Sequence, residues 1–410
     1  MLLGLITQVR NEMDIIKPFI NHIDALFDRV YLIDHQSVDG TRELLKQTVE
    51  QRPGWRFYSL ESKTKIQTAT ANLILHEAFA DGVDFLFFLD ADEFVEVNTR
   101  EDLENELNSW KDHSKIGTLR WKNCISETFL NNEFTFQSAL WVPQEESAFE
   151  KVIIPKELYA DSAGKIAVSN GNHMVFSLDR GQIPTTRIGS LFHVPIRSRD
   201  QACRKVILTI VSYRGYKEWG KGNSFQYYEM LKKIAEGEVT DDDLRGYTLG
   251  FESPNLALSR VTEEDLLIYG YKVTSFEKLK IASTNRIQYF SPRLYLGFEQ
   301  MMANALNNLE SNIPGDVKLI LNGDTIQIDE AALRERYLRE ELARKEQIKL
   351  LESTLKEREQ AIRVMEVQFT QYEVQLMQYK EEVRSYSLSN SWKITRPFRR
   401  LKDFLRKKQN

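Results

Sequence analysis

The sequence lacks the features that define several common classes of protein. In 410 residues there are two cysteines, Cys124 and Cys203, without a Cys-x-x-Cys spacing. This argues against a disulfide framework and a cysteine-based zinc cage, and we expect both thiols to be buried in a reducing compartment. No apolar run reaches the ~18 residues that a membrane-spanning helix needs. The N-terminus also lacks the basic region and cleavage site of a signal peptide, so we expect neither a membrane span nor a leader.

The chain also lacks a surplus of positive charge. Lys and Arg total 55 against 60 Asp and Glu, a net charge of −5, which argues against a nucleic-acid binder. The charge is uneven, because residues 392–410 hold eight basic residues and one acid. Phe398, Leu401 and Phe404 in this tail have helical spacing, so we predict a basic amphipathic helix that docks on an anionic membrane surface. A solvated, frayed tail is the alternative.

Two glycine-rich phosphate motifs are missing as well. The chain has neither Gly-x-Gly-x-x-Gly nor Gly-x-x-x-x-Gly-Lys-Ser/Thr, so neither a dinucleotide-binding fold nor a P-loop is supported. In their place, apolar strands alternate with helical patterns. We predict strands at 2–9, 29–33, 55–60 and 85–89, and helices at 11–26, 42–50 and 68–80. This alternation predicts an α/β fold with a buried, mostly parallel sheet.

The alternation loosens after residue 93. We expect a helix at 103–110, short strands at 117–121, 151–154, 173–176 and 190–194, and a hairpin around 322–324. Apolar residues then recur every seven positions from Ile348 to Val383, which predicts a coiled coil, with a helix packed on its own chain as the alternative. We therefore predict four parts. Residues 1–215 form a catalytic domain, and residues 216–329 form a mixed extension that completes this domain or its acceptor site. Residues 330–386 form a coiled coil, and residues 387–410 form a basic tail.

An acidic cluster after the strand at 85–89 is the main functional signal. Asp90 and Asp92 lie two residues apart, so in an extended chain they share one face. Paired carboxylates are ligands for Mg²⁺ or Mn²⁺, ions that bridge to substrate phosphates. Ligands of open α/β sheets bind beyond the carboxyl ends of the strands, and Asp34 ends another strand at that edge. Alone, Asp34 could equally cap a turn.

Three blocks in the same order resemble family 2 glycosyltransferases with the GT-A fold, above all the bacterial family 2-like branch. They are Arg10-Asn11-Glu12, the stretch 31–41 that contains Asp34 and Asp39-Gly40-Thr41, and the stretch 89–94 around Asp90 and Asp92. The block around His193 resembles the one that supplies the family's C-terminal histidine. The resemblance covers residues 1–215. It implies a GT-A type Rossmann-like mixed sheet flanked by helices, followed by a long C-terminal coiled-coil helix.

The resemblance also implies roles for the residues in these blocks. Val9, Arg10, Asn11 and Glu12 would line the nucleotide pocket, where the N–H groups of a helix start favour anions. Asp34 would contact the base or ribose, whereas Asp39 would shape its turn. The cofactor would be Mn²⁺ or Mg²⁺, and the donor a nucleoside-diphosphate sugar, with UDP as the expected nucleotide.

The metal ligands implied by the resemblance are Asp90, Asp92 and His193, and Asp92 also counts as catalytic. Asp90 would lie near the ribose as well, and His173 is the rival to His193. An inverting enzyme needs a carboxylate base, and no acid between the metal motif and the late histidine stands in a decisive pattern. Our candidate is Glu150, taken from a set that also holds Glu145, Glu146 and Asp161.

These observations predict a metal-dependent glycosyltransferase. It would pass a sugar to a hydroxyl of a cell-surface glycan or lipid-linked acceptor, with inversion. We expect a homo-oligomer formed through the coiled coil, located in the cytoplasm or on the inner face of the plasma membrane. Two alternatives stay open. One is a non-catalytic scaffold that binds a sugar nucleotide. The other is a nucleotidyltransferase, but that class needs a glycine-rich, basic phosphate loop after the first strand, and the residues that follow this strand, Arg10-Asn11-Glu12, do not provide one.

Overall fold

A computed structural model describes residues 1–61, 67–129, 134–135, 137–177, 179, 181–214, 225–237, 239–252, 259–284, 318–321 and 324–326. They belong to one compact unit, Met1–Arg344. The predicted coiled coil and basic tail lie outside the described residues and stay predictions. Among the helices that the structure describes, none is long and apolar enough to cross a membrane.

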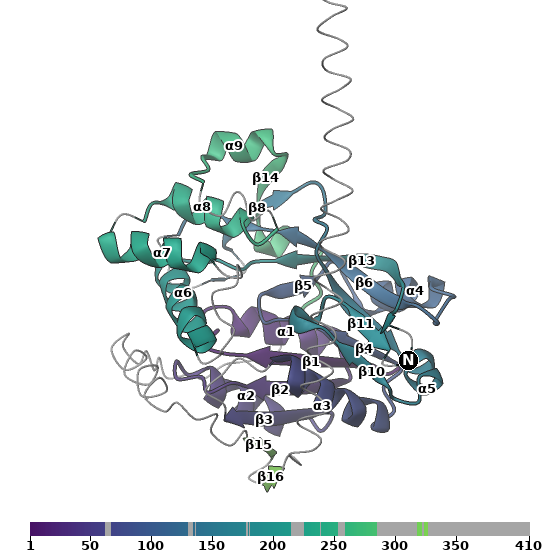
Figure 1. Cartoon of the computed structure of the whole chain (residues 1–410). Helices are drawn as coiled ribbons and strands as arrows, with labels where there is room; N and C mark the ends of the chain where they lie inside the picture. Colours follow the sequence, from purple (N-terminus) through teal and green to yellow (C-terminus); the bar gives the residue numbers. More distant parts are fainter. Residues whose placement is uncertain are drawn as a thin grey trace, which may run out of the picture. The chain divides into compact units, whose positions relative to one another are not determined.

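Strands and helices alternate in the first part of the chain, as predicted (Figure 1). The elements are β1 (Leu3–Val9), α1 (Ile16–Leu26), β2 (Arg29–Asp34), α2 (Thr41–Glu50), β3 (Trp55–Glu61), α3 (Gln67–Ala80), β4 (Phe85–Phe88) and β5 (Glu93–Val95). One prediction is wrong, since α1 begins at Ile16 and not at residue 11. Asn11 has a φ of 57°, in the left-handed region, so the chain turns there before the helix can begin.

The second part of the chain is more irregular. It contains α4 (Arg100–Ser109), β6 (Ile116–Asn123), β7 (Ile125–Ser126), β8 (Ala139–Pro143), β9 (Glu150–Pro155), α5 (Lys156–Asp161), β10 (Ile166–Val168), β11 (Val175–Ser177), β12 (Gly181–Gln182), β13 (Thr185–His193), α6 (Arg199–Arg214), α7 (Phe225–Glu236), α8 (Asp241–Leu249), α9 (Glu263–Ile268), β14 (Tyr271–Ser275), β15 (Lys318–Leu321) and β16 (Asp324–Ile326). The predicted hairpin is present as β15 and β16, in which Leu321 pairs with Asp324.

The central sheet is mixed, with the strand order β16-β15-β3-β2-β1-β4-β9-β6-β13-β5. Strands β3, β2, β1 and β4 are mutually parallel. Strand β9 is antiparallel to both β4 and β6, and β13 is parallel to β6. The carboxyl ends of β1, β2, β4, β6 and β13 therefore meet at one edge of the sheet. The first residues of β9 lie at that edge too.

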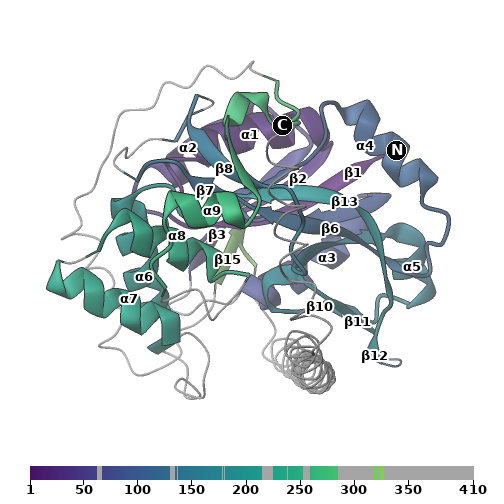
Figure 2. The same cartoon turned by 90° about the horizontal axis from the view of Figure 1, so that it is seen from above.

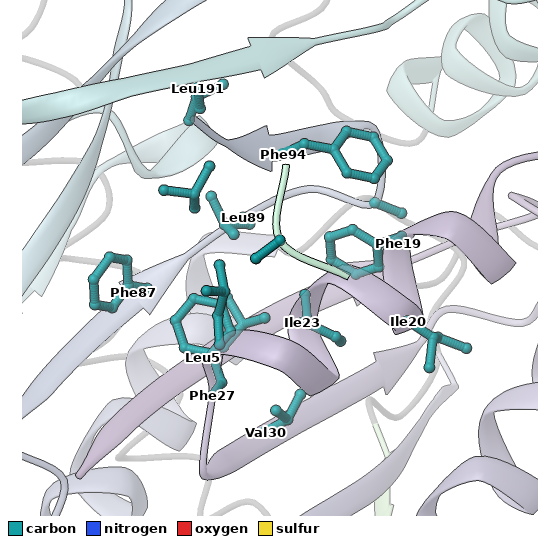
Figure 3. Packing of buried hydrophobic residues seen from close by; sticks show 14 of the residues in the cluster. Leu5, Phe19, Ile20, Ile23, Phe27, Val30, Phe87, Leu89, Phe94 and Leu191 are labelled. Atoms are coloured by element: carbon teal, nitrogen blue, oxygen red, sulfur yellow. The ribbon is translucent and has the colours of Figure 1, made fainter. Parts of the chain in front are cut away.

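Helices lie on both faces of the sheet, α1 on one and α3 on the other (Figure 2), and each face has its own hydrophobic cluster. Because side chains alternate along a strand, Leu3 and Leu5 of β1 pack against α1, whereas Ile6 packs against α3. Figure 3 shows the first cluster, in which Phe87 and Leu89 lie near Phe27 of α1's C-terminal end. The strands are buried on both faces, which explains their nearly continuous apolar sequence.

A third hydrophobic cluster joins the later helices to a smaller sheet, ordered β14-β8-β7. It contains Ile125 of β7, Val206 of α6 and Tyr247 of α8. The chain then returns to the central sheet, because β15 pairs with β3. The described parts of residues 216–329 thus pack on elements of residues 1–215. The boundary at residue 215 stays a prediction.

Candidate active site

A cavity of about 240 Å³ lies at the carboxyl edge of the central sheet. The strand ends contribute most of its wall, and α6 closes it from another side. The lining residues are Gln8, Val9, Arg10, Asn11, Glu12, His35, Gln67, Asp90, Ala91, Asp92, Trp121, His193, Gln201, Arg204, Lys205, Leu208, Thr209 and Phe251. The structure thus brings together the residues predicted from β1, β4 and β13. Asp34 and Glu150 are not among the residues that line the cavity.

Strand pairing places Asp92 beside His193. The short strand β5 follows Asp92 and pairs antiparallel with β13, so that Glu93 lies opposite His193. The Nε2 atom of His193 is then 4.0 Å from Oδ1 of Asp92. Trp121 stacks on the imidazole ring, with 4.1 Å between the ring centroids. Two sequence-distant residues are therefore held face to face by backbone pairing and an aromatic wall.

The hydrogen bonds around His193 fix the position of its proton. Asn123 donates from its amide nitrogen to the carbonyl of Thr248 at 2.8 Å, so its oxygen faces Nδ1 of His193 at 3.0 Å. An amide oxygen can only accept, so Nδ1 carries the proton. Burial lowers the pKa of His193 to about 3, despite the attraction of Asp92. The imidazole is therefore neutral, with the bare lone pair of Nε2 near the Asp92 carboxylate.

This arrangement fits a divalent cation held by Asp92 and His193. A lone pair and a carboxylate oxygen face each other without a shared proton, and a neighbouring group orients the histidine, as is common at metal sites. Within the described residues, however, no group of three or more His, Cys, Asp or Glu side chains could hold an ion. The predicted trio is therefore not preassembled, and Asp90 is the member that does not join.

Asp90 is occupied by hydrogen bonds of its own. Gln67 donates to Oδ1 at 2.7 Å, and Nζ of Lys151 donates to Oδ2 at 2.6 Å. Lys151 also lies 3.3 Å from Oε2 of Glu93, and both of these side chains are buried. Burial raises the pKa of Glu93 to about 8, against the attraction of Lys151. Asp90, whose side chain is 33% exposed and lines the cavity, is thus tied to the buried Lys151 and Glu93 behind it.

Asp92 faces cations as well as His193. Lys205 donates to Oδ2 at 3.0 Å, and Nη1 of Arg197 lies 3.8 Å from the same atom. Burial opposes ionisation of Asp92, but the Lys205 and Arg197 cations outweigh it and hold its pKa below the ordinary value. Asp92 is therefore a carboxylate at neutral pH.

Residues 10–12, which we predict to face the nucleotide and call the nucleotide-facing block, are built around a tight turn. The backbone N–H of Asn11 donates to the hydroxyl of Ser37 at 2.9 Å, and Oδ1 of Asn11 accepts from the N–H of Val38 at 2.8 Å. Glu12 forms an ion pair with Arg197, and burial raises the pKa of Glu12 to about 7. This block presents Arg10, Asn11 and Glu12 to the cavity, and their contact with a nucleotide stays a prediction.

Asp34 and Asp39 lie behind this block. Asp34 is fully buried, accepts a hydrogen bond from Arg42 at 2.6 Å and contacts the N–H of Ser37. Asp39 accepts hydrogen bonds from the backbone N–H of Met13 at 3.0 Å and of Thr41 at 3.1 Å. Both carboxylates thus serve the turns, which is the predicted role of Asp39. For Asp34 the structure favours the turn-capping interpretation.

Glu150 does not occupy the position expected of a base. Burial raises its pKa, and its carboxyl group is hydrogen-bonded by the side chain of Thr118. Its carbonyl oxygen contacts Nδ1 of His173 at 2.7 Å. Neither Glu150 nor His173 lines the cavity, and the residue after Glu150, Lys151, reaches Asp90. Of the two candidate histidines, His193 is therefore the one that the structure places at the cavity.

Sequence reasoning missed the cations of the site, namely Lys151, Arg197 and Lys205. Lys205 lies on α6, a helix that we did not predict. A signal was available, because Ala202, Val206 and Ile210 repeat at four-residue spacing and are buried. Lys151 carried no such signal, since a charged residue next to an apolar strand is normally solvated.

Comparisons with known proteins agree with the geometry. Residues 5–154 match Glycosyl transferase family 2. No curated protein matches the chain. Among solved structures, a mannosyltransferase from Pyrobaculum calidifontis, in complex with GDP-Man and Mn²⁺, is similar at 12% identity and a TM-score of 0.34, over 65% of this chain and 85% of that one. A cytidylyltransferase from Leptospira borgpetersenii is similar at 11% identity and a TM-score of 0.25, over 64% and 99% of the respective chains.

These structural scores are too low to carry a conclusion, so the identification rests on the family match. That match spans β1 to β9, which contain the nucleotide-facing block and the acid pair. The chain therefore carries a glycosyl transferase family 2 domain over residues 5–154, the domain of an enzyme that transfers a sugar from a nucleotide sugar.

Proposed function

We propose that this enzyme is a metal-dependent, inverting glycosyltransferase whose donor is a nucleoside-diphosphate sugar, with UDP as the expected nucleotide. The acceptor would be a hydroxyl of a cell-surface glycan or of a lipid-linked precursor. The observation that carries the proposal is the meeting of three strand ends at one cavity. These ends present the nucleotide-facing block, Asp92 and His193. His193 lies beyond the family match and enters the proposal from its geometry.

In this proposal a divalent cation binds Asp92 and His193, and the donor diphosphate and water supply its other ligands. When bound, such an ion acts as a Lewis acid that neutralises the charge of the departing diphosphate. The protein presents both ligands in defined states. Asn123 keeps Nε2 of His193 unprotonated, and nearby cations keep Asp92 ionised.

The donor nucleotide would lie along Arg10, Asn11 and Glu12. Arg10 offers charged donors for phosphate, and Glu12 offers an acceptor for hydroxyl groups. Asp34 attracts Arg10 electrostatically from a buried position. We propose that Asp34 orients this side of the pocket and does not touch the base or ribose.

A thermal-shift screen of the full chain tests the donor site. The ligands are UDP, GDP, CDP and dTDP, each with and without Mn²⁺. A ligand that binds only the folded state raises the melting temperature by mass action, so a metal-dependent shift with one nucleotide is expected. Well-folded protein without any shift would contradict the proposal.

Turnover then separates an enzyme from a scaffold. With Mn²⁺ and the sugar nucleotide of the selected base, we expect hydrolysis of the donor by the wild type. Asp92→Asn should lose this turnover, whereas Asp179→Asn, at an exposed position, should keep it. Nucleotide binding without any turnover would favour the non-catalytic scaffold. Release of pyrophosphate from a nucleoside triphosphate and a sugar phosphate would favour the nucleotidyltransferase.

We further propose that the coiled coil at 330–386 forms a homo-oligomer and that the tail at 387–410 binds the anionic inner face of the plasma membrane. The support is the heptad pattern and the basic amphipathic sequence. Leu355→Pro combined with Leu376→Pro should lower the mass measured by light scattering. Deletion of 392–410 should reduce sedimentation with anionic liposomes, and unchanged binding would contradict a membrane role.

A further inference from the structure

Two cations contact Asp92, and they differ in how firmly they are held. The Arg197 side chain is 1% exposed, and it is bound to Glu12, to Asp14 at 2.7 Å and to the carbonyl of Val194 at 3.1 Å. The Lys205 side chain is 24% exposed and lines the cavity. Its ammonium donates to Asp92 and to the carbonyl of Pro195, each at 3.0 Å.

These differences give the two cations different roles. Arg197 ties the nucleotide-facing block to the end of β13, and moving it would leave two buried acids without their partner. Lys205 has a flexible four-carbon stem and reaches Asp92 from the cavity side. Lys205 can therefore leave Asp92 at a much smaller cost than Arg197 can.

The ammonium of Lys205 and a divalent cation would compete for the same carboxylate. Oδ2 of Asp92 is bound by Lys205, while Oδ1 faces Nε2 of His193. A metal ion that uses this carboxylate brings two positive charges close to the ammonium, and like charges repel at such distances. The repulsion disappears if the ammonium moves onto an anion in the cavity, and the donor diphosphate is such an anion.

We propose that Lys205 neutralises Asp92 while the donor site is empty and transfers to the donor diphosphate when metal and nucleotide bind. This inference rests on the proposed function and adds a binding order to it. The metal binds weakly alone and tightly with the nucleotide, because the diphosphate offers Lys205 an anion that replaces Asp92. By thermodynamic linkage, the metal raises the affinity for the nucleotide by the same factor.

The test measures Mn²⁺ binding to the full chain by electron paramagnetic resonance of the free ion. Titrations run with and without the nucleoside diphosphate selected by the thermal-shift screen. For the wild type we expect this nucleotide to raise the Mn²⁺ affinity by about tenfold or more, within the usual range of coupling between two ligands. In Lys205→Met, Mn²⁺ alone should bind about tenfold tighter, and the gain from nucleotide should shrink by the same factor.

Two further variants complete the design. Lys232→Met removes the same charge from an exposed position on α7 and should match the wild type. Lys205→Gln replaces Lys205→Met if the latter fails to fold, and the same shifts are expected. Lys205→Arg keeps a cation beside Asp92 and should retain the weak binding of Mn²⁺ alone.

The outcomes separate this inference from the proposed function. If the wild type shows coupling but Lys205→Met or Lys205→Gln binds Mn²⁺ alone as the wild type does, or more weakly, then Lys205 does not hold the place of the metal at Asp92 and the inference is wrong. If the wild type does not bind Mn²⁺ even with nucleotide, the proposed metal site itself is wrong. Tighter binding of Mn²⁺ by Lys232→Met would show a general effect of net charge and would also overturn the inference.

Discussion

Lys151 offers the sharpest test of how the acid cluster is stabilised. Its side chain is 1% exposed, and its ammonium lies 2.6 Å from Asp90 and 3.3 Å from Glu93. The Glu93 side chain is fully buried, and its Oε1 has no hydrogen-bond partner in the described structure. Lys151→Met keeps most of the volume but removes the only charge that these contacts share. The perturbation therefore isolates the ionic contribution.

The expected loss of stability can be estimated from these contacts. A hydrogen bond to a charged group contributes about 1.5–3 kcal/mol, and breaking a buried ion pair costs about 3–5 kcal/mol. The pKa of Glu93 is raised to about 8, so Glu93 is already mostly protonated at neutral pH and stays neutral when the lysine is lost. Protonation limits the cost, and we expect a loss of about 3 kcal/mol. This corresponds to a melting temperature lower by about 6–12 °C.

Urea denaturation followed by circular dichroism measures this loss. Lys165→Met is the matched control, because Lys165 pairs with Asp179 at 3.4 Å with both side chains more than half exposed. Such a surface pair contributes about 0–1 kcal/mol. Adding Glu93→Gln to Lys151→Met should recover part of the loss. If Lys151→Met and Lys165→Met destabilise equally, the buried cluster is not held together by its lysine, and our reasoning is wrong.

Three further predictions concern residues around the site. Burial lowers the pKa of His22 to about 4, so acid should destabilise the fold: between pH 7 and 4.5, the wild type should lose about 2 kcal/mol more than His22→Gln, measured by urea denaturation. Acid destabilises the fold because the unfolded chain binds a proton at His22 more readily than the folded chain does. Asn123→Leu removes the acceptor that fixes the imidazole tautomer, so Mn²⁺ affinity should fall about 10–100-fold in the resonance assay. Asp39→Asn turns an acceptor toward a backbone N–H into a donor and should cost about 1–3 kcal/mol in thermal melts, whereas an unchanged melting temperature would contradict the turn role.

The strand–helix alternation of the first 95 residues could be predicted because it depends on residues that are close together in the sequence. The strands are rich in apolar residues, and α1 and α2 each show a helical periodicity. The start of α1 was missed because Asn11 takes its conformation from Ser37 and Val38, which are distant in sequence. A helical pattern does not record such contacts.

In the candidate site too, the local patterns were predictable and the contacts between distant residues were not. Asp90 and Asp92 stand out because they follow a buried strand, and Arg10 to Glu12 because they follow another. That Asp90 and Asp92 would have different partners was not predictable. Asp90 is bound by Lys151 of β9, and β9 is an antiparallel strand inserted beside β4. Glu150 begins that strand, but its side chain does not line the cavity. Strand order and direction depend on pairing between distant segments, which a single sequence does not state.

The sequence by itself determined the α/β class, the edge of the sheet where the cavity lies and the acid pair at that edge, because all three depend on the local order of apolar and polar residues. Only the tertiary structure decided which side chains meet there. The pairing of β5 with β13 sets His193 opposite Glu93 and so beside Asp92, and the packing of α6 brings Lys205 to the Asp92 carboxylate. These contacts join residues about a hundred positions apart, and only the folded chain places them within ångströms of each other.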